Sequence, residues 1–156
     1  MITIHTVDTG QAERLRQVRA LLYQYGEERN FDAALGNFTA ELDNLPGQYA
    51  LPSGTLLLAT LDKNPAGCIA FRALDHKICE MKRLYVAPKF RGQGIARWLI
   101  RQLLQRARTL GYSLMRLDSH PHMHAAIHLY RQFDFIEIEA YNHNPTPGIR
   151  FFERRL

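Results

Sequence analysis

Apolar residues follow two different periods along the first half of the chain. Residues 2–7 alternate between apolar and polar positions, which predicts a first or edge strand. Residues 11–28 repeat apolar side chains at helical spacing with arginines opposite, so this segment is predicted to form an amphipathic helix. A second helix is predicted over residues 33–45, because the pattern stops at Pro46-Gly47.

Strands dominate the middle of the chain, and strands and helices alternate after it. The apolar run 55–61 predicts a buried strand, and turn residues 62–65 lead into a second strand over 66–73. The remaining predicted elements are a strand at 77–86, a helix at 95–110, a strand at 112–118, a short helix at 123–133, and strands at 135–140 and 149–154. This order predicts an α/β fold of the α+β type with a mixed sheet, and not a doubly wound one.

Length and composition indicate one ordinary globular domain. The chain has 156 residues, 46% of them hydrophobic, with no repeat or linker, so residues 1–156 are predicted to form a single domain. The net charge is +5, and Arg97, Arg101 and Arg108 share one face of a predicted helix. We interpret this face as solvated and expect no nucleic-acid partner, because no basic stripe with interleaved aromatic residues is present. A basic rim would also attract an anionic cofactor.

The pattern contains no membrane or secretory signal. No apolar run reaches the length of a membrane span, and the first residues lack the basic and apolar regions of a signal peptide. Cys68 and Cys79 are the two cysteines, and a disulfide framework is not expected. We therefore expect a cytoplasmic protein with no membrane partner, either a monomer or a homodimer.

Residues 84–96 join a predicted strand to a predicted helix through a glycine-bearing loop. Free N–H groups at a helix N-terminus carry a partial positive charge, so this junction favours an anion. Gly92 and Gly94 let the backbone approach a bulky ligand, and Arg91 adds a planar set of donors suited to phosphate oxygens. These features predict a phosphate or pyrophosphate site, whereas the glycines alone would also suit an ordinary turn before a helix.

The common phosphate-binding motifs do not fit this junction. A P-loop needs Lys and then Ser or Thr after its last glycine, whereas Gly94 is followed by Ile95-Ala96. A Rossmann fingerprint needs a third small residue where this chain has Arg97. The remaining pattern is Arg-x-x-Gly-x-Gly/Ala, formed by Arg91, Gly94 and Ala96.

This pattern resembles the coenzyme A pyrophosphate loop of the GNAT N-acetyltransferase superfamily. Residues 125–135 resemble the Ala-x-x-Leu-Tyr-x-x-x-Gly-Phe motif of the same family, in the family's order and at about its separation. The resemblance in sequence covers roughly the last half of the chain. In the first half, only the order of helices and strands resembles the family. It implies a GNAT-like fold, with a mixed, mostly antiparallel central sheet flanked by helices, and acetyl-CoA (coenzyme A) as the co-substrate.

The resemblance also implies which residues bind the cofactor. The strand end at Leu84, Tyr85 and Val86 would bond the pantetheine through backbone groups, and an N–H there would face the thioester oxygen. The N–H groups from Gln93 to Ala96 would hold the pyrophosphate. The cofactor-binding residues predicted in the loop are Arg91, Gly92, Gln93, Gly94, Ile95 and Ala96.

Tyr130 is the predicted general acid, because it occupies the tyrosine of the family's Leu-Tyr motif. A phenol pKa of about 10 lies above the thiol value of about 8.5, so a tyrosine can protonate a departing thiolate as charge develops. The alternative is an aromatic residue that packs on the sheet, since residues 126–133 also form an apolar stripe.

Glu80 is the predicted base, acting directly or through water. It lies six residues before Val86 and resembles the strand glutamate that some family members use. The alternative is a structural ion pair with a neighbouring basic residue, Lys82, Arg83 or Arg116. His120 is a second candidate, because its ordinary pKa lies near neutrality.

Two positions depart from the family pattern. Asp134 replaces the glycine that usually precedes the motif's phenylalanine. This position follows a helix end, where the left-handed conformation is expected, and aspartate tolerates that conformation better than most residues. Met123 stands where many relatives have a cofactor-binding asparagine.

Several histidines crowd the same region. His124 and His128 have the i,i+4 spacing of a zinc pair, and Asp118 could be a third ligand of a metal hydrolase. No glutamate follows the first histidine, and the segment coincides with the acetyltransferase motif, so no metal site is predicted.

The predicted function is transfer of an acetyl group from acetyl-CoA to the primary amine of a small molecule. A protein or peptide N-acetyltransferase with the same site, a non-catalytic acyl-CoA-binding regulator and the metal hydrolase are the alternatives. The acceptor is expected to be selected by residues 25–50 and 141–148, which lie outside both motifs.

Overall fold

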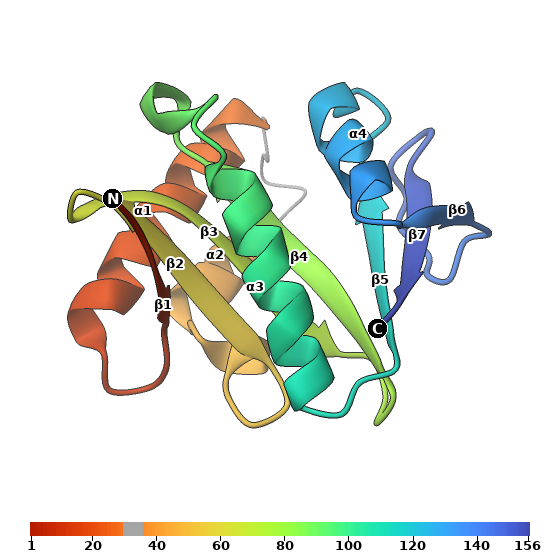
Figure 1. The fold of residues 1–156 in the computed structure, drawn as a ribbon, viewed down its shortest axis with the longest axis horizontal. Coiled ribbons are helices and arrows are strands. Elements are labelled where there is room, and N and C mark those ends of the chain that lie inside the picture. Colours follow the sequence, from red (N-terminus) through yellow and green to blue (C-terminus); the bar gives the residue numbers. More distant parts are fainter. Residues whose placement is uncertain (30–35) are drawn as a thin grey trace.

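The computed structural model describes residues 1–29 and 36–156, which form a seven-stranded sheet with helices on both faces (Figure 1). The helices are α1 (Ala12–Glu28), α2 (Gly36–Asp43), α3 (Ile95–Thr109) and α4 (His124–Gln132), with two 3-10 turns at Gly47–Tyr49 and Pro88–Phe90. The strands are β1 (Ile2–Thr6), β2 (Thr55–Leu61), β3 (Asn64–Ala73), β4 (Ile78–Val86), β5 (Leu114–Ser119), β6 (Ile136–Ile138) and β7 (Arg150–Arg155).

The sheet is mixed and mostly antiparallel, as predicted. Its strand order is β1-β2-β3-β4-β5-β7-β6, and the pairing of β4 with β5 is parallel while the other pairs are antiparallel. The predicted elements agree with the observed ones to within a few residues. The start of the helix predicted at 33–45 lies outside the described residues. The described part of that prediction corresponds to α2, which ends at Asp43. The 3-10 turns were not predicted, because a three-residue turn has no hydrophobic period.

Two hydrophobic cores lie on opposite faces of the sheet, because side chains alternate along each strand. On β2, Leu57 and Ala59 belong to the core that includes residues of α3 and α4, whereas Leu56 and Leu58 belong to the core that includes residues of α1 and α2. Figure 1 shows α3 in front of the sheet and α1 and α2 behind it. The predicted apolar stripe of α3 is buried throughout.

Left-handed residues end both C-terminal helices. Gly111, directly after the C-cap of α3, has φ 92°, and Asp134, which replaces the family glycine after α4, has φ 66°. The expectation that aspartate would adopt this conformation is therefore confirmed. Within the described chain, no helix is long and apolar enough to cross a lipid bilayer.

Strand β4 parts from β5 after Glu80 (Figure 1). The two strands pair only from Ile78 to Glu80. Beyond that point β4 carries an extra residue relative to β3, and Arg83 has φ 64°. Such a bulge bends and twists a strand. The edge of β4 that follows Glu80 therefore faces an opening instead of a neighbouring strand.

Candidate active site

A cavity of about 470 Å³, called here the β4–β5 cavity, occupies the opening between the two strands. Its walls come from the end of α1, from α2, from the bulged part of β4, from the end of β5 with the following loop, from α4 and from residues 144–149. Both segments expected to select the acceptor, residues 25–50 and 141–148, contribute to this lining. Segments far apart in the chain therefore meet at the point where the sheet opens.

A buried ion pair holds one wall of this cavity. Arg83 donates to the carboxylate of Glu41 on α2 through two nitrogens, at 2.6 and 2.9 Å. The two side chains are only 18% and 16% exposed, and the guanidinium lies 5.1 Å from the ring centroid of Phe38. A paired, planar contact of this kind fixes orientation as well as charge. The pair therefore ties α2 to the strained residue of the β4 bulge.

Tyr130 lies on the lining of the cavity and also belongs to a hydrophobic core. It is 5% exposed, and its ring lies 6.0 Å from that of Phe135 and 6.4 Å from that of Phe152. Burial raises the pKa of Tyr130 above its ordinary value, so the phenol stays protonated at neutral pH. A neutral phenol at this position can donate a proton into the cavity. The packing alternative and the acid prediction are compatible, and the acid role stays a prediction.

Glu80 lies outside the residues that line the cavity. It is 1% exposed, and it accepts hydrogen bonds from Arg72 at 2.8 Å and from the hydroxyl of Tyr141 at 2.5 Å, with Lys82 at 3.7 Å. Of the three partners expected from sequence, Lys82 is the one that forms an ion pair with Glu80, although Arg116 lies opposite Glu80 on β5. Arg83 pairs with Glu41, and Arg116 pairs with Glu153. The structure thus separates Glu80 from Tyr130, and the base role of Glu80 stays a prediction.

Glu80→Gln is expected to destabilise the fold by about 1–3 kcal/mol, because Arg72 and Lys82 lose the negative charge that holds them. For a chain of this size that corresponds to a Tm lowered by roughly 2–4 °C for each kcal/mol. Glu13→Gln is the matched control, since Glu13 forms an exposed pair with Arg16 and its loss should leave Tm nearly unchanged. Equal melting temperatures for the two variants would contradict a structural role for Glu80.

The loop that joins β4 to α3 has the backbone expected of an anion site. Gly92 and Gly94 have φ angles of 80° and 81°, and an added Cβ at either would meet no atom within 4 Å. No side chain caps α3, and its first intrahelical bond runs from Trp98 to Gly94 at 3.1 Å. The amides of Ile95 and Ala96 precede that bond and lack an intrahelical acceptor. The geometry supports the predicted pyrophosphate contacts, which stay predictions.

Arg91 bonds to the end of β4 and to α1. Its Nε donates to the carbonyl of Val86 and its second nitrogen to Glu28, both at 2.8 Å, and the guanidinium lies 5.7 Å from the ring centroid of Tyr85. Tyr85 also donates its hydroxyl to Glu28 at 2.8 Å. The hydrogen bond from Arg91 is the main reason that the pKa of Glu28 lies below its ordinary value. Arg91 therefore joins α1 to the loop, and Leu84 alone of the strand-end residues 84–86 lines the cavity.

His120 and His122 lie on the lining of the β4–β5 cavity, with ring centroids 4.9 Å apart. Burial, followed by the charges of His122 and Arg29, lowers the pKa of His120 below 6.5, so its ring is neutral at pH 7. His124 and His128 are exposed on α4, outside the cavity. Among residues 1–29 and 36–156, no group of three potential ligands is arranged to hold a metal ion.

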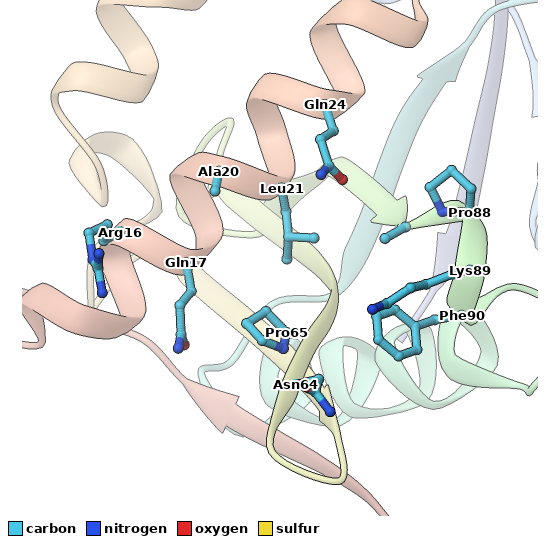
Figure 2. Close-up of a pocket in the computed structure, with 11 residues that line it drawn as sticks. Arg16, Gln17, Ala20, Leu21, Gln24, Asn64, Pro65, Pro88, Lys89 and Phe90 are labelled. Carbon is cyan, nitrogen blue, oxygen red and sulfur yellow. The ribbon is translucent and has the colours of Figure 1, made fainter.

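A second cavity of about 650 Å³ lies between α1 and the Pro88–Phe90 turn (Figure 2). Residues such as Leu21, Pro65 and Phe90 give it an apolar wall, and Gln17 and Lys89 add polar groups. Its described lining contains no histidine, tyrosine or carboxylate, so it offers no proton donor or acceptor of the kind that lines the β4–β5 cavity. The chemistry is therefore assigned to the β4–β5 cavity.

Comparison with known proteins agrees with this geometry. The profile of the acetyltransferase (GNAT) family matches residues 15–135. The chain belongs to the GNAT family. It is therefore an acyltransferase, and the enzyme class expected from the two motifs is confirmed.

Individual relatives cover most of this acetyltransferase. An uncharacterised N-acetyltransferase of Schizosaccharomyces pombe is 36% identical over 144 residues, covering 91% of this chain and 88% of that protein. The N-acetylaspartate synthetase of Rattus norvegicus is 32% identical over 135 residues, covering 83% of this chain and 44% of that protein. In fold, the chain is similar to an N-acetyltransferase of Thermoplasma acidophilum solved with coenzyme A, with a TM-score of 0.78 at 14% identity and coverage of 100% and 99%.

Several residues of the site were missed from the sequence. Glu28, Arg29 and Glu41 line the cavity but lie in the first third of the chain, outside both motifs. Ser119 has a buried hydroxyl with no hydrogen-bond partner among the described residues, and it too lines the cavity. Charged residues at a helix end look like ordinary surface positions in a sequence, so only the fold could reveal them.

Proposed function

We propose that this acetyltransferase transfers the acetyl group of acetyl-CoA to the primary amine of a small molecule. The β4–β5 cavity supports this function most directly, because it combines the parted strand edge with buried Tyr130 and neutral His120. Its volume of about 470 Å³ falls in the range typical of small-molecule sites. The name of the rat relative refers to an acetylated amino acid, which also favours a small acceptor.

The cofactor would lie along the edge of β4 that has no neighbouring strand. The backbone beyond Glu80 offers donors and acceptors to the pantetheine, and the amides of Ile95 and Ala96 face the pyrophosphate. The structure of the Thermoplasma acidophilum enzyme solved with coenzyme A shares this fold, which supports a cofactor in the same general position. Acetyl-CoA is therefore the proposed co-substrate.

The reaction needs one proton acceptor and one proton donor. The lone pair of the acceptor amine attacks the thioester carbonyl carbon, so a C–N bond forms and the C–S bond breaks. His120 takes the proton that the amine loses, and Tyr130 gives its proton to the departing thiolate. We favour His120 over Glu80 as the base, because His120 lies on the cavity lining while Glu80 is held by Arg72 and Tyr141.

A panel of small amines and one peptide, assayed with acetyl-CoA by the release of free thiol, tests this function. We expect turnover of small amines and little or none of the peptide. Faster turnover of the peptide would show a protein-modifying enzyme, and acetyl-CoA binding without any turnover would show a non-catalytic regulator.

His120→Gln is expected to lower kcat/KM by about 10²-fold, the lower end for a general base. A base acts only when neutral, so wild-type kcat/KM should fall as the pH drops through the pKa of His120, which lies below 6.5. The variant should lose this acid limb. His124→Gln, on the exposed side of α4, is the control and should match the wild type. An unchanged acid limb in His120→Gln would return the base role to Glu80 or water.

A further inference from the structure

Most charges around the β4–β5 cavity cancel in pairs. Glu41 pairs with Arg83 at 2.6 Å, and Glu28 pairs with Arg91 at 2.8 Å. Lys82, also on the lining, faces Glu80 at 3.7 Å. These pairs leave little net charge for recognising an acceptor.

Two charged side chains on the lining remain without an oppositely charged partner among residues 1–29 and 36–156. Arg29 follows the end of α1, and its guanidinium lies 5.8 Å from the ring centroid of Tyr25. Asp118 lies near the end of β5 and forms no ion pair. The cavity therefore presents one positive and one negative group.

The carboxylate of Asp118 is held in place on one side. Its Oδ2 accepts hydrogen bonds from the side-chain amides of Asn142 at 2.9 Å and Asn144 at 3.3 Å. The segment that carries these amides is in turn anchored by the hydrogen bond from Tyr141 to buried Glu80. Within the described chain, Oδ1 accepts no hydrogen bond. One oxygen is thus oriented by neutral donors, and the other is available to a ligand.

Arg29 and Asp118 line the same cavity as the proposed acid, Tyr130. Burial is the main cause of the raised pKa of Tyr130, while the charge of Arg29 acts to lower this pKa and that of Asp118 to raise it. His120, the proposed base, follows Asp118 by two residues and is also affected by Arg29. The two unpaired charges therefore share one cavity lining with the groups that would move protons, which is where the acceptor amine would lie.

We propose that Asp118 and Arg29 select an amino acid as the acceptor, with the amino group on Asp118 and the carboxylate on Arg29. This inference rests on the proposed acetyl transfer to a small primary amine, and it names the class of that amine. A guanidinium binds a carboxylate through two parallel hydrogen bonds, and a carboxylate oxygen accepts well from an ammonium group. A simple alkylamine would pair with Asp118 and leave Arg29 desolvated and unpaired, which is unfavourable.

Amino acids compared with their own amides provide the test. The probes are L-alanine, L-aspartate and L-glutamine, each against the corresponding α-carboxamide, which keeps size and shape but removes the α-carboxylate charge. We expect kcat/KM for the free acids to exceed that for the amides by about 10- to 100-fold, the fold-change expected for one hydrogen-bonded charge. Acid and amide acetylated equally well would overturn the inference.

Variants assign the two ends of the acceptor. Arg29→Gln should bring the acid-to-amide ratio of kcat/KM close to one, whatever its effect on the absolute turnover of the amides. Asp118→Asn should lower kcat/KM for acids and amides alike by about 10- to 100-fold, because both carry the amino group. Arg14→Gln is the control, because it also removes one arginine charge but lies within α1, outside the cavity lining. This variant should keep the wild-type preference for acids over amides.

The outcomes separate this inference from the proposed function. Turnover of amides and simple amines with no effect of Arg29→Gln overturns the role of Arg29 and leaves acetyl transfer in place. No turnover of any acid, amide, amine or peptide overturns both. Because the acid-to-amide ratio is measured within each variant, a general loss of stability cannot imitate the expected result.

Discussion

Gly94→Asp is expected to weaken acetyl-CoA binding by about 10²-fold or more, which corresponds to the loss of one or two charge-assisted hydrogen bonds at ~1.5–3 kcal/mol each. Gly94 is the N-cap of α3, and a side chain added there would point into open space. A carboxylate at this point would meet the negative pyrophosphate and also occupy its place. Isothermal titration calorimetry with acetyl-CoA measures the effect.

Gly94→Asn separates charge from bulk. Asparagine has nearly the same shape and tolerates the left-handed φ of 81° about as well as aspartate, so any cost to folding should be shared by the two variants. We expect asparagine to weaken binding clearly less than aspartate does. Wild-type affinity in a folded Gly94→Asp protein would remove the anion site from this loop.

Tyr130→Phe is expected to lower kcat by about 10²–10⁴-fold, the usual contribution of a general acid. KM for acetyl-CoA should change little, because the lost interaction forms only as the thiolate leaves. The phenyl ring keeps its contacts with Phe135 and Phe152, and within residues 1–29 and 36–156 the hydroxyl of Tyr130 has no hydrogen-bond partner to lose. Steady-state kinetics on an acceptor identified by the amine panel, together with a melting curve, measure both quantities.

Tyr112→Phe is the matched control for this substitution. Tyr112 donates to the carbonyl of Ser53 at 2.6 Å and packs against Phe71, outside the residues that line the β4–β5 cavity. Loss of the Tyr112 hydroxyl should lower stability and leave kcat unchanged. If Tyr130→Phe keeps turnover within about twofold of the wild type, Tyr130 is a packing residue and another group protonates the thiolate.

Features that depend on neighbouring residues could be predicted from the sequence. The spacing of hydrophobic residues predicted the bounds of α3 and β2 to within one residue. The reason is that this spacing reflects the geometry of a single helix or strand. The left-handed position at Asp134 followed from its place beside a helix end. The two GNAT motifs located the loop and Tyr130 for the same reason, because each motif lies within one short segment.

Features that depend on strand register were decided only by the tertiary structure. The extra residue at Arg83 exists only relative to β3, and it lies in the part of β4 that has no pairing with β5. No local pattern marks it, because Arg83 stands in a segment that reads as one continuous strand. The position of the β4–β5 cavity therefore could not be derived from periodicity.

The partners of charged residues also required the fold. Glu80 and Tyr141 lie 61 positions apart, and Glu28 and Arg91 lie 63 positions apart. A carboxylate in a strand is compatible with a base, an ion pair or an exposed position until its neighbours are known. The sequence by itself therefore determined the fold class and the family and located the proposed anion-binding loop, since these depend on local order along the chain. The tertiary structure decided which acids and bases share the cavity, because those contacts join segments that only folding brings together.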